Sequence, residues 1–225
     1  MALAVELLSS RTLIIGDVHG CLSELEELLH VAGWSATDAL VLAGDLVAKG
    51  PDSQGVVQLA REKGALSVLG NHDAHVLKIR ATGDGKKHHT EVAKTLTDAD
   101  WRYLEAMPIV LPFEQQGFVI AHGGLVPGVP LDKQEKDVVI NMRSIDGAGK
   151  PHKHIEGGDP WASRWPGPLH ALFGHDAVRG LQQWPHATGL DTGCVYGRKL
   201  TGLWWPERRL VSVPARKAWA GTGEE

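Results

Sequence analysis

Six short apolar runs that each end at a glycine constrain the fold of this chain more than any other feature. They occupy residues 12–16, 39–44, 66–70, 118–124, 171–174 and 187–193. Apolar runs without polar alternation are typical of strands that are covered on both faces. We therefore expect an α/β fold with layers on either side of its strands.

Helical patterns lie between the first three runs. In residues 22–33 leucines recur at helical spacing, Ser23 and Glu26 form a capping-box pattern, and Gly33 offers a C-terminal stop. Residues 51–64 predict a second helix. The alternation of strand and helix predicts a parallel α/β core in this part of the chain.

The second half of the chain has a different pattern of predicted elements. From about residue 188, short β-prone runs alternate with turn residues at 197–198 and 206–207, which predicts an antiparallel meander. Residues 83–91 and 146–160 are polar and glycine-rich without periodicity. We expect solvated loops there, since histidine-containing loops of this composition usually contact only water.

Composition excludes several classes of partner. The 225 residues fit one domain over residues 1–225, with a frayed tail from about residue 215. A net charge of -4 provides no basic field for duplex nucleic acid. No apolar stretch approaches the ~20 residues that span a bilayer, and the first ten residues lack the basic region of a signal peptide. We therefore expect a cytoplasmic protein without a membrane partner, in which Cys21 and Cys194 stay reduced.

Polar side chains follow five of the apolar runs, where each predicted strand ends. These residues are Asp17, His19, Asp45, Asn71, His72, His122 and His175. Alone, an aspartate after a strand is usually a turn former, and a buried histidine is usually a hydrogen-bonded core residue. Folding alone does not require five glycine-flanked strand ends that all carry nitrogen or oxygen ligands. Since α/β sheets bind ligands at the carboxyl ends of their strands, we expect these side chains to converge.

Apart from His72, these side chains offer two carboxylates, an amide oxygen and three imidazoles, and no thiolate. Such donors suit Mn²⁺, Fe²⁺ or Zn²⁺. Six donors are too many for one tetrahedral ion but suffice for two ions that share a carboxylate, and ions about 3.5 to 4 Å apart can clamp a phosphoryl group. We expect two divalent ions, Mn²⁺ first, with Fe²⁺, Co²⁺ or Zn²⁺ as alternatives.

The motifs GDVHG, GDLVAKG, GNHD, AHGG and GH, in this order, resemble those of the calcineurin-like metallophosphoesterases. Within that family they are most similar to the branch of phosphoprotein phosphatases and bacterial symmetrical diadenosine tetraphosphatases. The resemblance runs from about residue 11 to 213. It implies a four-layer αββα sandwich with a dinuclear metal site at the carboxyl ends of the strands.

The resemblance also implies roles for individual residues. It places Asp17, His19 and Asp45 on one metal, and Asp45 as a bridge with Asn71, His122 and His175 on the other. It makes His72 the acid that protonates the leaving oxygen, a task that suits an imidazole near neutral pH. It makes Arg143 a phosphate ligand, for which a planar guanidinium is well shaped. A turn histidine and a surface arginine are the plainer alternatives.

Two departures from the family pattern concern the second motif. Ala48 stands where phosphoprotein phosphatases carry the aspartate that orients the acid histidine, so we expect Asp73 or water to take that role. Lys49 stands where both groups usually have an arginine, which keeps the charge but loses the bidentate geometry.

Further substrate contacts are expected from the second half of the chain. Arg164 could contact phosphate, and Trp161 and Trp165 could stack on adenine, although core packing is the more common role of tryptophan. Tyr196 and Asp191 could support the site or simply shape a hairpin turn.

The expected function is metal-dependent hydrolysis of diadenosine tetraphosphate into two ADP molecules by a metal-bridging hydroxide. The alternative is a Mn²⁺-dependent phosphoprotein phosphatase acting on serine, threonine or tyrosine phosphates, and one dinuclear centre can serve both substrates. A non-catalytic binding module on a decayed hydrolase scaffold predicts lost ligands, and none of the six is lost.

Overall fold

Five strands form the first sheet of the computed structural model, which describes residues 11–221. Their order is β13-β12-β1-β2-β3, with bounds β1 Thr12–Ile15, β2 Ala39–Leu42, β3 Leu66–Ser67, β12 Lys199–Trp205 and β13 Arg209–Pro214. β1, β2 and β3 run parallel, whereas β12 pairs antiparallel with β1 and with β13. The predicted parallel core is therefore confirmed, extended by an antiparallel hairpin from the end of the chain.

Another five strands form the second sheet, in the order β10-β11-β9-β5-β4. Their bounds are β4 Val110–Phe113, β5 Phe118–Ala121, β9 His170–Phe173, β10 Gln182–Trp184 and β11 Ala187–Gly189. β5, β9 and β11 run parallel, and β4 and β10 close the edges antiparallel. The predicted meander holds for β12 and β13, but β11 pairs in this other sheet instead.

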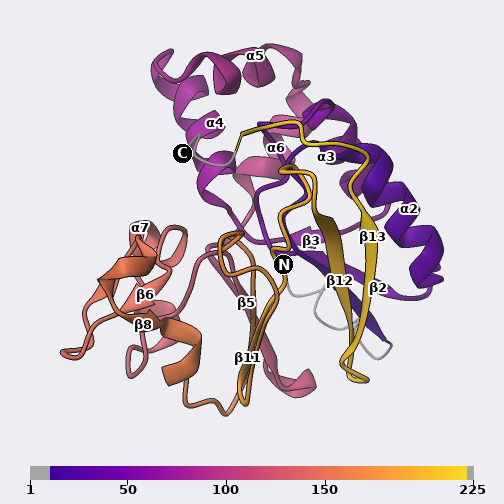
Figure 1. Ribbon diagram of the computed structural model, residues 1–225. Helices are drawn as coiled ribbons and strands as arrows, with labels where there is room; N and C mark the ends of the chain where they lie inside the picture. The colour runs from indigo at the N-terminus through magenta and orange to yellow at the C-terminus, as the bar shows by residue number, and fades with distance from the viewer. Residues whose placement is uncertain (1–10, 222–225) are drawn as a thin grey trace.

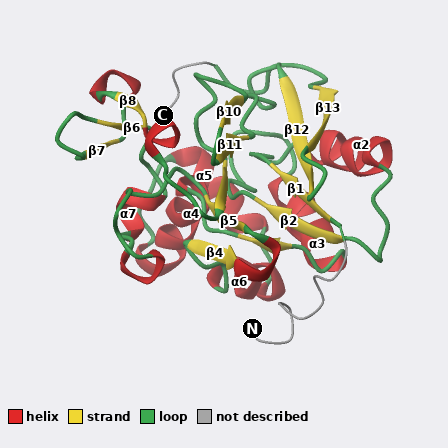
Figure 2. Ribbon diagram, turned by 90° about the horizontal axis from the view of Figure 1, so that it is seen from below, coloured by secondary structure: helices red, strands yellow, loops and turns green. Residues whose placement is uncertain are grey.

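Helices flank the sheets on their outer faces (Figure 1). Their bounds are α2 Leu22–Ala32, α3 Ser53–Glu62, α4 Asn71–Thr82, α5 Lys87–Thr95, α6 Asp98–Glu105 and α7 Lys136–Val139. Short 3₁₀ turns lie at Glu114–Gln116, Leu131–Lys133, Ile155–Gly157 and Trp161–Arg164. A three-stranded sheet of β6 Ser144–Ile145, β7 Pro151–His152 and β8 Asp159–Pro160 packs near α7 (Figure 2).

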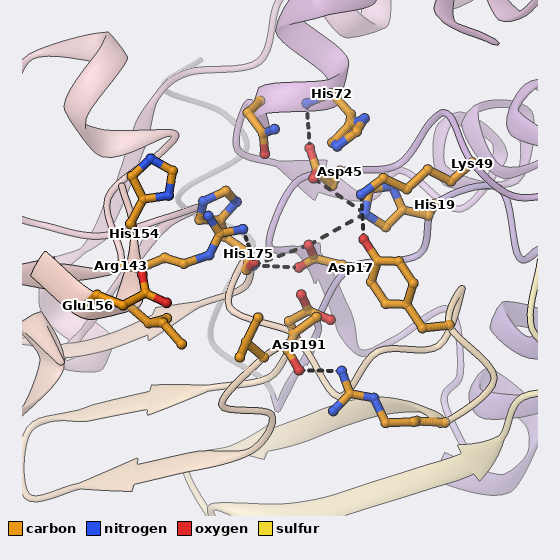
Figure 3. A pocket seen from close by; sticks show the side chains of 16 residues that line it. Asp17, His19, Asp45, Lys49, His72, Arg143, His154, Glu156, His175 and Asp191 are labelled. Carbon is orange, nitrogen blue, oxygen red and sulfur yellow. Dashed lines mark hydrogen bonds and ion pairs between the residues drawn. The ribbon is translucent and has the colours of Figure 1, made fainter. Parts of the chain in front are cut away.

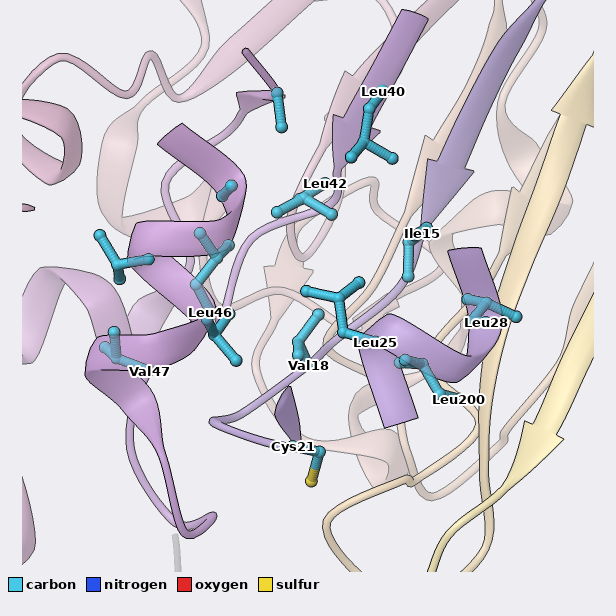
Figure 4. Packing of buried hydrophobic residues seen from close by; sticks show 14 of the residues in the cluster. Ile15, Val18, Cys21, Leu25, Leu28, Leu40, Leu42, Leu46, Val47 and Leu200 are labelled. Atoms are coloured by element: carbon cyan, nitrogen blue, oxygen red, sulfur yellow. The ribbon is translucent and has the colours of Figure 1, made fainter. Parts of the chain in front are cut away.

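Side chains of the central strands alternate between two apolar layers. On β1, Leu13 and Ile15 join the cluster under α2, whereas Ile14 joins Phe118 and Leu172 between the two sheets. Figure 4 shows Ile15 beside Leu25 in the outer cluster. Because both sheets bury both faces, the predicted mixed α/β sandwich is confirmed. The outer layer on the second sheet consists of α7, the small sheet and 3₁₀ turns rather than long helices.

Helix ends match their sequence signals unevenly. Gly33 ends α2 with φ of 70°, as predicted, but Cys21 occupies the N-cap position without a side-chain hydrogen bond, so the Ser23 capping box does not form. α3 begins after Asp52, whose carboxylate accepts a hydrogen bond from the Gly55 N–H.

Three expectations about loops and termini need correction. Half of the expected 83–91 loop belongs to α5, and the 146–160 segment contains β7 and β8. Residues 215–221 are not frayed: the Arg216 N–H donates to the Glu24 carboxylate, and the Trp219 N–H donates to the Val195 carbonyl. Residues 1–10 and 222–225, which include the segment considered as a signal peptide, lie outside the described residues.

Cys21 and Cys194 are buried and free, as predicted. Within residues 11–221, no helix has the length and apolar character to cross a bilayer.

Candidate metal centre

The six predicted ligands lie where the parallel strands of both sheets end. Asp17 and His19 follow β1, Asp45 follows β2, and Asn71 begins α4 after β3. His122 follows β5 and His175 follows β9 in the second sheet. Because the two sheets pack face to face, their carboxyl ends bring these side chains together, and five of the six line one hollow (Figure 3). His122 is fully buried directly beside it, against Asp45.

Asp45 occupies the centre of this group. Its Oδ2 atom lies 3.5 Å from His19 Nε2 and 3.3 Å from His122 Nε2. Among the described sets of candidate ligands whose donor atoms lie within 4.8 Å of one another, two contain Asp45: one adds His19 and His72, the other His122 and His175. A carboxylate shared by two ligand sets is the arrangement that two neighbouring cations require.

Backbone carbonyls fix the orientation of the three histidine rings. His19 Nδ1 lies 3.2 Å from the Val47 carbonyl oxygen, and His122 Nδ1 lies 2.8 Å from that of Ala43. His175 Nε2 lies 3.0 Å from the Asn141 carbonyl oxygen. Since a carbonyl only accepts, each ring donates N–H there and presents its other nitrogen to the site as the one available to a cation, which is how proteins orient metal-binding histidines.

Backbone conformation at these ligands is unusual. His19, Asp45 and His175 have φ values of 47°, 52° and 65°, in the left-handed region that non-glycine residues rarely occupy. Such strain is found mainly at functional sites, where the surrounding structure holds it.

Neighbouring glycines make room for the carboxylates. A Cβ atom on Gly70 would overlap Oδ1 of Asp45, and one on Gly174 would overlap Oδ1 of Asp17. The glycines of the strand-end motifs are therefore required by the ligands themselves.

Burial and mutual charge shift the titration of the buried ligands. Burial raises the pKa of Asp17 well above its usual range. Burial also opposes ionisation of Asp45, but His122, followed by His72, holds the pKa of Asp45 well below its usual value. Burial lowers the pKa of His122, yet the charges of Asp45 and Asp17 outweigh it and raise that pKa to about 10. The site thus favours positive charge beside its carboxylates.

The hollow has a volume of about 710 Å³ and is lined by most of the predicted substrate contacts. Lys49 Nζ donates to the Tyr196 hydroxyl at 2.6 Å, so these two residues form one wall. Arg143 lines the same hollow, where its guanidinium donates to the carbonyl oxygens of Lys153 and His175. Asp191 lines it too and accepts from the Gly193 N–H.

Arg164 is not brought to this hollow. Its guanidinium donates to the Asp146 carbonyl and to the Asp159 carboxylate, within the segment of the small sheet. Trp161 and Trp165 donate their indole N–H groups to the carbonyls of Gly123 and Leu169, which makes them anchors of the second sheet's outer layer rather than stacking platforms.

Asp73 does not orient His72, contrary to expectation. The Asp73 carboxylate accepts four backbone N–H groups, from Gly70 and from Asp45, Leu46 and Val47. It therefore clamps the loop after β2 against the start of α4. Burial, followed by the charge of Asp45, raises the pKa of Asp73 to about 7.

His72 instead contacts a histidine that sequence reasoning missed. His72 Nδ1 lies 3.0 Å from His89 Nε2, and both side chains are buried. His89 belongs to α5, together with Val92 and Ala93 that pack against the core. A helical signal in the sequence could have revealed it, because apolar residues follow His89 at helical spacing, at Val92, Ala93 and Leu96.

The hollow is also lined by residues that were not predicted from the sequence: residues 154–156, Val178 and Arg198.

The donor set fits divalent metal ions. Two carboxylates, one amide oxygen and three preset imidazoles converge within a buried region, and none is a thiolate. This mixture suits Mn²⁺, Fe²⁺ or Zn²⁺ and is unlike a structural cysteine site.

Comparison with known proteins agrees with this geometry. A model of the calcineurin-like phosphoesterase family matches residues 10–202. The chain is 32% identical to an asymmetrical bis(5'-nucleosyl)-tetraphosphatase of Oceanobacillus iheyensis, over 91% of this chain and 92% of the relative. It is also 32% identical to a symmetrical bis(5'-nucleosyl)-tetraphosphatase of Edwardsiella ictaluri, over 92% and 97%. A solved structure assigned provisionally as a diadenosine tetraphosphatase is 41% identical, with a TM-score of 0.86, over 92% and 94%.

Proposed function

The chain belongs to the calcineurin-like phosphoesterases, and on this premise we propose that it is a metal-dependent hydrolase that splits diadenosine tetraphosphate symmetrically into two ADP molecules. The observation that carries the proposal is the position of Asp45, whose carboxylate belongs to two candidate ligand sets at once. The chain is similar to tetraphosphatases over nine-tenths of its length, and this similarity supports a dinucleoside polyphosphate as the substrate.

In this proposal Asp17, His19 and Asp45 hold one divalent ion, and Asp45, Asn71, His122 and His175 hold the second. When bound, such a pair lowers the pKa of water and neutralises phosphate charge. Mn²⁺ is our first candidate. Arg143 and Lys49, on the rim of the same hollow, bind phosphate oxygens, and Tyr196 holds the Lys49 ammonium in place.

His72 supplies the proton to the leaving phosphate oxygen. Its ring is perpendicular to the His19 ring, with centroids 4.9 Å apart, and one of its nitrogens lies within 4.8 Å of the donor atoms of His19 and Asp45. His89 holds the other side of the ring through the Nδ1 contact. His89 is therefore a positioning residue, and it takes the role that the alanine at position 48 cannot perform.

A second hollow supports a long substrate. It has a volume of about 740 Å³, shares Lys49 with the first, and is lined by Lys86 and Lys87. The three ammonium groups outnumber the carboxylates of Asp52 and Glu91 that also line it, which suits a polyphosphate chain with a nucleoside at each end. A small phosphomonoester needs only the first hollow.

The test is to incubate Mn²⁺-loaded protein with diadenosine tetraphosphate and to separate the nucleotides by anion-exchange chromatography. We expect ADP as the only nucleotide product. AMP with ATP would instead assign the asymmetrical cleavage named for the Oceanobacillus relative. Intact substrate together with phosphate release from a phosphopeptide would replace the proposal by the phosphatase alternative.

A further inference from the structure

Three imidazoles lie together behind the metal centre. His72 of α4 and His88 and His89 of α5 have donor nitrogens within 4.8 Å of one another. His72 and His89 are buried, and His88 is partly buried. The rings of His88 and His89 lie with centroids 3.9 Å apart and planes tilted by 40°. This group shares no residue with the six ligands assigned above.

The spacing of this group is close to that of a metal site. His72 Nδ1 and His89 Nε2 are 3.0 Å apart, whereas two nitrogens on a tetrahedral Zn²⁺ with bonds of about 2.0 to 2.1 Å lie about 3.3 Å apart. A shift of a few tenths of an ångström, a turn of both rings toward the ion and loss of the shared N–H proton to solvent therefore turn the hydrogen-bonded pair into a ligand pair. We propose that His72, His88 and His89 form a third metal site, selective for Zn²⁺ over Mn²⁺, that inhibits the enzyme when filled.

Ligand chemistry separates this site from the dinuclear centre. The three donors are all imidazoles, which suit Zn²⁺ and Cu²⁺, whereas carboxylate and amide oxygens suit Mn²⁺. Three protein ligands leave the fourth tetrahedral position to water. Mn²⁺ at ordinary concentrations should consequently fill the first two sites and leave the third to zinc.

An ion can reach the third site from solvent. His88 lines the second hollow, which none of the six proposed ligands lines, while His72 lines the first. The histidine group therefore forms the partition between the two hollows. Zinc entering from the second hollow meets His88 first and need not displace the ions of the first.

Occupation of this site would disable the acid. This step rests on the proposed role of His72. An acid imidazole carries protons on both nitrogens, and an ion at Nδ1 takes the place of one of them. The ion also replaces the 3.0 Å contact between His72 Nδ1 and His89 Nε2, so the ring is held in the orientation of a metal ligand instead of that of the acid.

Metal content tests the binding part without any assay of catalysis. Protein is equilibrated with Mn²⁺ and with zinc buffered at a fixed free concentration, passed through a desalting column and analysed for elements. We expect three ions per wild-type chain and two per chain in His88→Gln and in His89→Gln. His75→Gln is the matched control, because His75 is exposed and lies against His89 without belonging to the ligand set; it should keep three. Two ions per wild-type chain, or three per chain in His88→Gln, would refute the proposed third site.

Activity with and without buffered zinc tests the inhibition. We expect zinc to slow hydrolysis by about tenfold or more in wild type and by less than about twofold in His88→Gln. Equal inhibition of both proteins would show that zinc acts at the dinuclear centre instead. A chain that binds three ions but never hydrolyses the dinucleotide would refute the proposed function and leave the third site standing.

Discussion

The backbone N–H of His72 donates to Oδ1 of Asp45 at 2.9 Å, so the proposed shared ligand also fixes the first turn of α4, which carries the proposed acid. The other oxygen of Asp45 faces His19 and His122. The carboxylate thus links both proposed ions to the position of His72. In this proposal the same carboxylate therefore holds the metal ions and fixes the position of the acid.

Asp45→Asn should remove metal and activity together. An amide cannot bridge two cations and supplies no charge, so we expect bound Mn²⁺ to fall below one ion per chain and turnover to fall by about a thousandfold or more. Elemental analysis and initial rates measure both. Two ions retained in the variant would contradict the bridging role.

His72→Gln should separate catalysis from metal binding. We expect kcat to fall by about 10²- to 10⁴-fold with two ions still bound, because the side chain is an acid and not a ligand of the pair. The loss should shrink for p-nitrophenyl phosphate, whose leaving group needs no proton. A loss of equal size on both substrates would argue against acid catalysis.

His89→Ala should reproduce a weaker form of the same pattern. Without its Nδ1 partner the His72 ring is less well oriented, so kcat should fall by about 10- to 100-fold with KM nearly unchanged. The leaving-group dependence should follow that of His72→Gln. Loss of activity that is independent of the leaving group would mean that His89 only packs α5 against α4.

Gly70→Ala should abolish metal binding although it adds one methyl group. The new Cβ would overlap the Asp45 carboxylate, which must then move. Gly147→Ala is the matched control, since a Cβ at Gly147 meets no atom within 4 Å. Elemental analysis should find about two ions in the control and fewer than one in Gly70→Ala; equal content in the two variants would refute the steric account.

The raised pKa of His122 should appear in the stability of metal-free protein. The folded-state pKa of about 10 exceeds the ordinary value of 6.5, so the stabilisation is complete below pH 6.5 and is lost as pH rises through 10. Urea unfolding should show the free energy of unfolding falling across this window by up to about 1.4 kcal/mol per pH unit. His122→Asn should lack this part of the slope; an unchanged profile would show that the His122 proton is not held by Asp45 and Asp17.

The proposed ligands could be predicted from sequence because each one lies within four residues of the end of a strand. A glycine, an apolar run and one polar residue are local signals, and they identified Asp17, Asp45 and His175 without knowledge of the sheets. These local signals could not predict which strands belong to which sheet. β12 pairs with β1, which lies far away in sequence, and β11 pairs with β9 in the other sheet.

The His89 contact illustrates what local signals leave out. α5 resembles a polar loop by composition, and its histidines become significant only when the helix packs against α4 and brings His89 to His72. The expectation for Asp73 was wrong for the opposite reason. Its proximity to His72 in sequence suggested a shared task, but four backbone N–H groups take both of its oxygens.

Anomalous diffraction from crystals soaked in Mn²⁺ alone tests the central claim most directly. The account predicts two manganese peaks, both within bonding distance of the Asp45 carboxylate, with His19 at one and His122 and His175 at the other. A single peak, or peaks that Asp45 does not touch, would contradict it.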